Sequence, residues 1–172
     1  MVSDQWSVVS GQWSVVSGPL SGSVDERLGR TLLYSRVMGD RPLELWLVRH
    51  GETTHSRDGM LAGWSDIPLT AVGETQAEAV RPLLAGERFD SVWCSDLARA
   101  VRTAELAWGD ARRDARLREI SFGRLEGQPW AALDENAKQA LVAFSGFAPP
   151  GGETIEAMVE RVHSLLAELP PG

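Results

Sequence analysis

The chain has 172 residues, 43% of them hydrophobic, which is enough for one globular domain with a buried core. Its formal net charge of −7 argues against a global attraction to nucleic acid or to an anionic membrane surface, so a phosphate site would need local positive charge. No apolar run reaches the length of a membrane span, and the N-terminus lacks the basic and apolar segments of a secretory signal. We therefore expect a cytoplasmic protein, whose single cysteine, Cys94, fits a reducing compartment and a place in the core.

Residues 1–42 are interpreted as a low-complexity leader. The unit QWSVVSG occurs twice in succession, at 5–11 and at 12–18. Alternating Trp and Val give the unit some strand tendency, but two copies of seven residues are too few for a solenoid. We expect this stretch to be a disordered or accidental extension. A translation start at Met38 is a hypothesis that native peptides from residues 1–37 would exclude.

Organised structure is predicted from residue 43 onward. The apolar run LELWLV at 43–48 predicts a buried strand of the kind found in parallel sheets, and the triplet RHG follows it. The polar residues 51–70 predict a long loop, and loops of that length in compact domains are often functional.

Helices and short strands alternate after this loop. The expected elements are, in chain order, a helix from its N-cap Thr70 to Pro82, a strand at 89–94, a helix capped by Ser95 and Asp96, a strand at 115–120, a helix from Pro129, and a helix with an apolar stripe from Ile155 to Leu169. This alternation predicts an α/β fold, a three-layer sandwich with a mostly parallel central sheet. Ligands of such sheets bind beyond the carboxyl ends of the strands, where Arg49 and His50 lie.

The triplet Arg49-His50-Gly51 has the chemistry of a nucleophile beside an anion site. An arginine holds anions through forked, charge-assisted hydrogen bonds. Its charge also lowers the pKa of the neighbouring histidine, which favours the neutral, nucleophilic ring. Gly51 lets backbone approach a ligand closely. By itself the triplet is weak evidence, because a histidine at a strand end more often makes a structural hydrogen bond.

Four ordered motifs strengthen this interpretation. They are RHGETTHSRDGMLAGWSDIPLTAVGETQA at 49–77, SDLARAVRTAEL at 95–106, LREISFGRLEG at 117–127 and PPGGETIEAMVERV at 149–162. Over about residues 43–169 the chain resembles the histidine phosphatase (phosphoglycerate mutase-like) superfamily. The third motif resembles the phosphatase branches of that superfamily more than the glycolytic mutases.

The resemblance implies roles for single residues. His50 would attack the phosphorus and carry the phosphoryl group, Arg49 and Arg99 would clamp the phosphate oxygens, and Glu119 would protonate the leaving oxygen. The residues implied to bind substrate are Arg49, Ser56, Gly63, Arg99 and Glu153. Without the resemblance, a surface ion pair with Arg118 would be the preferred interpretation of Glu119.

The resemblance also implies a further strand after the last helix, central in the sheet beside the first strand and ending in a second histidine. The chain stops at Gly172, where that strand would begin. We therefore expect residues 43–172 to form a histidine phosphatase domain that lacks its C-terminal part. His163 cannot replace the second histidine, because it lies within a helix instead of at a strand end.

Three functions stay open. The preferred one is hydrolysis of a small phosphomonoester through a phosphohistidine on His50. The alternatives are a phosphoglycerate mutase and a catalytically inactive fragment that binds anions or a partner. No metal or cofactor is expected, because three scattered histidines and one cysteine show no ligand spacing and no glycine-rich nucleotide loop is present. A small phosphorylated substrate is the expected partner, without nucleic acid or membrane; the oligomeric state is not predicted.

Overall fold

The computed structural model describes residues 13–17, 32–37 and 43–169, with side chains from Leu45 onward. Its strands are β1 (Trp13–Ser17), β2 (Leu32–Val37), β3 (Leu43–Arg49), β4 (Ser91–Cys94) and β5 (Arg112–Arg113). Its α-helices are α1 (Thr54–Asp58), α2 (Ala71–Leu84), α3 (Ala98–Ala107), α4 (Glu135–Ala143) and α5 (Ile155–Leu166). Short 3-10 turns cover Ala115–Leu117, Gly123–Leu125 and Trp130–Ala132. Within these ranges no helix is long and apolar enough to cross a membrane.

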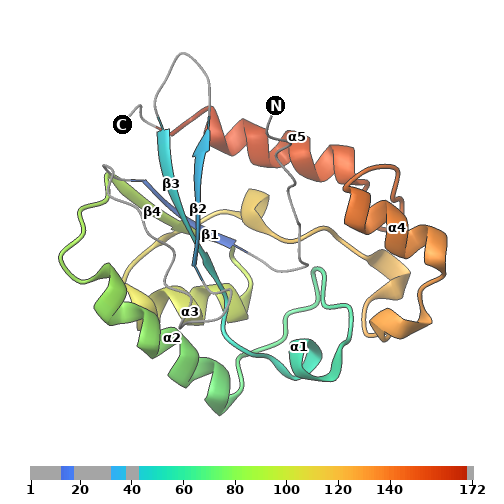
Figure 1. The fold of residues 1–172 in the computed structure, drawn as a ribbon, viewed down its shortest axis with the longest axis horizontal. Coiled ribbons are helices and arrows are strands. Elements are labelled where there is room, and N and C mark those ends of the chain that lie inside the picture. The colour runs from blue at the N-terminus through green and yellow to red at the C-terminus, as the bar shows by residue number, and fades with distance from the viewer. Residues whose placement is uncertain (1–12, 18–31, 38–42, 170–172) are drawn as a thin grey trace, which may run out of the picture.

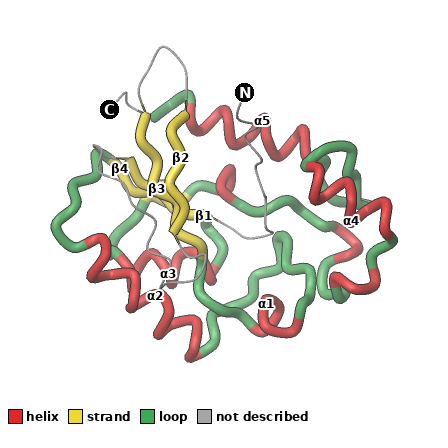
Figure 2. Tube along the Cα trace, in the orientation of Figure 1, coloured by secondary structure: helices red, strands yellow, loops and turns green. Residues whose placement is uncertain are grey.

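The five strands form one sheet in the order β2-β3-β1-β4-β5. Figures 1 and 2 label β1 to β4 of this sheet. β1 pairs antiparallel with both β3 and β4, so β3 and β4 run in the same direction with β1 between them. β2 pairs antiparallel with β3, whereas β4 and β5 are parallel. The α/β class is confirmed. The sheet is mixed instead of mostly parallel, because β1 and β2 run against the other three strands.

Both reversed strands come from the expected leader. β1 lies within the second copy of QWSVVSG, and its Val16 stands opposite Trp46 of β3 and Val92 of β4. Residues 13–17 and 32–37 are therefore paired in the sheet, and the prediction of disorder for them is wrong. A central place beside β3, which the resemblance assigned to a later strand, is held by β1. The other residues of the leader, including the first copy of the repeat, lie outside the described residues.

Alternating side chains of β3 build the core on both faces of the sheet. Leu45 and Leu47 pack with Leu165 of α5, and Trp46 and Val48 pack with Val80 of α2. The sheet therefore forms a middle layer, with α5 on one face and α2 and α3 on the other (Figure 1). A separate apolar cluster joins the loop after α1 to the segments around α4 and α5; its buried members are Leu61, Ile120, Phe122, Leu133, Phe147 and Ile155.

Two of the predicted helix starts are confirmed by side-chain caps. The Gly73 N–H donates to Thr70 Oγ1 at 3.1 Å, and the Ala157 N–H donates to Thr154 Oγ1 at 3.1 Å. The predicted start of α3 is wrong. Its N-cap is Leu97, and the Ala98 N–H donates to Asp66 Oδ1 at 2.7 Å from the loop before α2.

Two further predictions differ from the structure. Residues 115–120, expected to be a strand, form a 3-10 turn and extended chain, and the short β5 precedes them. The helix expected from Pro129 is a 3-10 turn followed by α4. Its real start is set by Asp134, whose carboxylate accepts the Ala137 N–H at 2.8 Å.

Candidate active site

His50 follows the last residue of β3 directly. Its Nδ1 lies 2.6 Å from Gly51 O, and because a carbonyl oxygen can only accept, Nδ1 carries the proton and Nε2 keeps its lone pair. Burial lowers the pKa of His50 to about 4; the hydrogen bond to Gly51 opposes this shift, and the charges of Arg99 and Arg49 add to it. Near neutral pH the ring is therefore uncharged, with a nucleophilic nitrogen.

The residues after His50 are packed tightly against α2 and α3. The Gly51 N–H donates to the buried Thr103 Oγ1 at 3.1 Å. A Cβ on Gly51 would lie 2.1 Å from Gly73 O, and one on Gly73 would lie 2.1 Å from Glu52 O. Both glycines are required by this contact between residues 51–52 and the first turn of α2.

Arg99 lies in the first turn of α3 with its side chain fully buried. Its Nη1 donates to Ser65 O and its Nη2 to Gly63 O, each at 2.7 Å. Its Nε has no hydrogen-bond partner among the described residues. A buried guanidinium N–H without a partner is costly, which makes Nε a donor suited to an anion beside His50.

Glu119 lies after the 3-10 turn that ends at Leu117. Burial raises its pKa to about 7; the charges of Arg99 and Arg49 oppose the shift, and Glu126 adds to it. A carboxyl group with this pKa can donate a proton near neutral pH. Its sequence neighbour Arg118 pairs with Asp96 instead, Nε to Oδ1 at 2.7 Å, so the simple surface ion pair is not formed.

The four residues expected to carry the chemistry thus come together from three parts of the chain. Arg49 and Arg99 each act electrostatically on both His50 and Glu119. One nucleophile, one proton donor and two cations are what transfer of a phosphoryl group requires. Their individual roles stay predictions.

The other residues expected to bind substrate have partners within the protein. The Ser56 hydroxyl accepts the Thr53 N–H at 2.9 Å and donates to Thr53 O at 3.1 Å, in a capping box of α1. A bond from Ser56 to phosphate would replace that donation. Gly63 has φ of +50°, and a Cβ there would lie 2.4 Å from Glu126 Oε1. Contact of both with substrate stays a prediction.

Glu153, also expected to bind substrate, is paired within the protein. Arg161 Nε and Nη2 donate to its two carboxylate oxygens at 2.6 Å and 2.8 Å. A substrate group that bound Glu153 would therefore compete with this bidentate pair.

Sequence reasoning missed Glu126 and Arg161. Glu126 accepts the Trp64 N–H at 2.9 Å and the Ser65 hydroxyl at 2.6 Å, and so holds the loop that binds Arg99. Both residues lie inside the quoted motifs, but their partners in the site are distant in sequence. Their position inside the motifs was the only sequence feature that could have pointed to them.

Other nucleophiles and ligands contribute little to this site. Burial raises the pKa of Cys94 to about 11, so its thiol stays protonated and unreactive near neutral pH. In the described part of the chain, no three His, Cys, Asp or Glu residues gather as a metal site would require.

Comparison with known proteins identifies the family. A family model for the Histidine phosphatase superfamily (branch 1) matches residues 45–171. The chain belongs to this superfamily. Fructose-2,6-bisphosphatase TIGAR B of Danio rerio is 38% identical over 134 residues, which are 73% of this chain and 52% of that protein. The chain spans about half the length of the first curated relatives that it matches.

Solved structures of a mutase and of a phosphatase share the fold. A phosphoglycerate mutase from Thermus thermophilus is 50% identical with a TM-score of 0.64, over 70% of this chain and 68% of that one. A mycobacterial glucosyl-3-phosphoglycerate phosphatase, solved in complex with VO3, is 33% identical with a TM-score of 0.61, over 70% of this chain and 63% of that one. Phosphatases and mutases are thus both among the similar proteins.

Proposed function

We propose that this histidine phosphatase hydrolyses a small phosphomonoester through a phosphohistidine on His50. The observation that carries the proposal is that His50 and Glu119 are under the electrostatic influence of the same two arginines, Arg49 and Arg99, with their pKa values shifted in opposite directions. His50 is neutral with the Nε2 lone pair available, while the raised pKa of Glu119 keeps a proton on its carboxyl group. Similarity to a fructose-2,6-bisphosphatase and to a glucosyl-3-phosphoglycerate phosphatase supports a phosphatase.

The first half-reaction transfers the phosphoryl group to the enzyme. The lone pair of His50 Nε2 forms a bond to phosphorus while the bond from phosphorus to the leaving oxygen breaks. Glu119 gives its proton to that oxygen, so the product leaves as a neutral alcohol. Arg49 and Arg99 stabilise the charge on the phosphoryl oxygens during the transfer.

The second half-reaction restores the enzyme. The carboxylate of Glu119 takes a proton from a water molecule, whose oxygen forms a bond to phosphorus while the bond from phosphorus to Nε2 breaks. Inorganic phosphate leaves, His50 is again neutral and Glu119 is again protonated.

The test of this proposal is phosphoryl labelling of His50. Wild-type protein given a ³²P-labelled phosphomonoester should form an acid-labile, base-stable protein label and release phosphate. His50→Ala should do neither. His163→Ala is the matched control, because His163 is exposed on α5 and should keep both activities. Labelling that persists in His50→Ala would remove His50 as the nucleophile.

Phosphoglycerate mutase is the second candidate, favoured by the 50% identity to the Thermus protein. The same intermediate would then return its phosphoryl group to a second hydroxyl of the substrate. Stimulation by a bisphosphoglycerate primer would support the mutase, whereas phosphate release without a primer would support the phosphatase. Vanadate binding by a wild type that forms no label would favour the inactive fragment that binds anions.

The proposal also includes a cytoplasmic location and a small phosphorylated metabolite as the partner. Its support is the chemistry of the site and the single cysteine of the chain, Cys94, which is buried.

A further inference from the structure

The guanidinium of Arg161 binds two main-chain carbonyls and one carboxylate near the site. From α5 its Nη1 donates to Arg116 O at 2.6 Å, and its Nη2 donates to Glu119 O at 2.8 Å. Its Nε and Nη2 also bind the two carboxylate oxygens of Glu153. The two side chains are only 16% and 13% exposed, so the ion pair is shielded from solvent.

The main chain at Glu119 is held from two sides. Its carbonyl oxygen accepts from Arg161 and also from Trp64 Nε1, at 2.8 Å each. Both donors bind the main-chain oxygen and not the carboxyl group. They therefore determine where the side chain begins, without occupying the oxygens that exchange the proton.

We infer that Arg161 is a positioning residue that holds Glu119 where its carboxyl group can meet the leaving oxygen. Glu153 orients Arg161 by binding the Nε and Nη2 edge of the planar guanidinium. In this orientation Nη2 also donates to Glu119 O, and Nη1 donates to Arg116 O. This inference rests on the proposed role of Glu119 as proton donor. It gives Glu153 a task that requires no contact with substrate.

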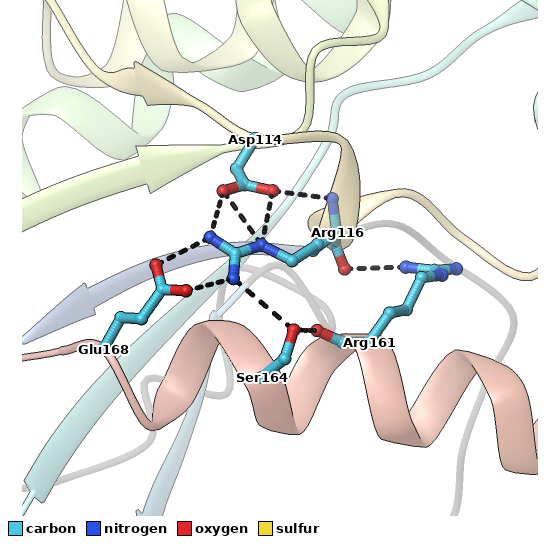
Figure 3. A network of polar contacts seen from close by, with 5 residues as sticks. All are labelled: Asp114, Arg116, Arg161, Ser164 and Glu168. Carbon is cyan, nitrogen blue, oxygen red and sulfur yellow. Dashed lines mark hydrogen bonds and ion pairs between the residues drawn. The ribbon is translucent and has the colours of Figure 1, made fainter.

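A neighbouring arginine offers a matched control. Arg116 also joins α5 to the segment before Glu119, since it binds Asp114 at 2.8 Å and Glu168 at 2.6 Å (Figure 3). Its side-chain hydrogen bonds go to Asp114, Ser164 and Glu168 and leave the carbonyl of Glu119 to Arg161 and Trp64. Arg116→Met removes the ion pairs of Arg116 with Asp114 and Glu168 but keeps the main-chain carbonyl of residue 116, which Arg161 binds.

The test compares two substrates that need the proton donor to different degrees. Nitrophenolate leaves readily without protonation, whereas the alkoxide of glycerol phosphate does not. In Arg161→Met, kcat/KM, which reports the first half-reaction alone, should fall about 100-fold for glycerol phosphate, a general acid's usual contribution, and less than about threefold for p-nitrophenyl phosphate. Arg116→Met should leave the rate constants for both substrates unchanged. Arg161→Lys should give rate constants between those of Arg161→Met and the wild type.

Equal losses on both substrates would overturn the inference, because they would indicate general damage to the fold. A wild-type protein that hydrolyses neither substrate would count against the proposed function instead. Deuterium uptake by residues 117–120 then decides on the inference without turnover. Faster uptake in Arg161→Met than in Arg116→Met supports it, and equal uptake in the two variants overturns it.

Discussion

At His50 and Glu119, burial shifts two pKa values in opposite directions and favours the neutral form of both groups. The pKa of His50 falls to about 4 and that of Glu119 rises to about 7. Between these values the histidine is an uncharged nucleophile while the carboxyl group still carries its proton. The pair is thus prepared for the first half-reaction in weakly acidic to neutral solution.

The first prediction is a bell-shaped dependence of kcat/KM on pH. Activity should fall below about pH 4, as His50 gains a proton, and above about pH 7, as Glu119 loses one. Glu119→Gln should lower the rate and abolish the fall on the basic side. Glu160→Gln, an exposed change on α5, should leave both limbs in place. A basic limb that survives in Glu119→Gln would assign it to another group.

The second prediction concerns stability. The raised pKa of Glu119 means that the folded state holds a proton which the unfolded state releases above about pH 4.5. The contribution of Glu119 to the free energy of unfolding is therefore most favourable below about pH 4.5 and is lost as the pH rises towards 7. Glu119→Gln should therefore gain stability relative to wild type between pH 5 and pH 8, measured by urea unfolding at both values. If the free energies of unfolding of Glu119→Gln and wild type differ by the same amount at pH 5 and at pH 8, the pKa of Glu119 is not raised by folding.

The third prediction follows from the buried guanidinium of Arg99. Arg99→Ala leaves the carbonyls of Gly63 and Ser65 without their donor, so it should lower the free energy of unfolding by roughly 3 kcal/mol as well as weaken vanadate binding. Arg102→Ala, an exposed change on the same helix, should do neither. Calorimetry and vanadate titration measure the two effects. Unchanged stability would show that the loop needs no support from Arg99.

At the scale of elements, the residues directly after His50 rest on the first turn of α2. The Thr70 N–H donates to Glu52 O at 2.9 Å, and the paired glycines at 51 and 73 bring the two segments together without side chains. His50 is therefore placed by a helix that follows it by about twenty residues.

The fourth prediction tests this contact. Gly73→Ala would put a Cβ 2.1 Å from Glu52 O, so the loop or the helix must move. A displacement of about 1 Å at a reacting group can cost about 100-fold in rate. We expect at least a tenfold lower kcat and a lower melting temperature. Glu78→Ala on the exposed side of α2 is the control. A more stable Gly73→Ala, as helix propensity alone would give, contradicts the contact.

Helix starts show which elements were predictable. Thr70 and Thr154 were identified correctly, because each cap bonds an N–H three residues later in the chain. The start of α3 was not, because its cap comes from Asp66, 32 residues before Ala98. The helical spacing of apolar residues after Pro129 predicted one continuous helix, but the structure has a break at Asp134, which caps the start of α4.

At the scale of the whole molecule, β1 joins the two halves of the sheet. It lies between β3, which His50 follows, and β4, which leads to Arg99. Both of its edges are paired: residues 13–17 pair with β3, and residues 15–17 pair with β4.

The fifth prediction tests the place of β1. Val16→Pro removes a ladder hydrogen bond from a central strand and should cost about 3 kcal/mol or more. Val16→Ala, which keeps the backbone N–H at the same position, is the control and should cost less. Urea unfolding of the two variants provides the comparison. A Val16→Pro variant as stable as the wild type would mean that this strand does not hold the sheet together.

The sequence by itself determined what depends on near neighbours and on motif order. It predicted β3 with His50 at its end and the caps of α2 and α5, because apolar periodicity and capping hydrogen bonds involve residues only a few positions apart. It predicted the family from the order of the four motifs. The tertiary structure alone decided the protonation of Glu119, the buried tether of Arg99 and the place of β1. These depend on desolvation and on contacts between residues tens of positions apart, which no local pattern specifies.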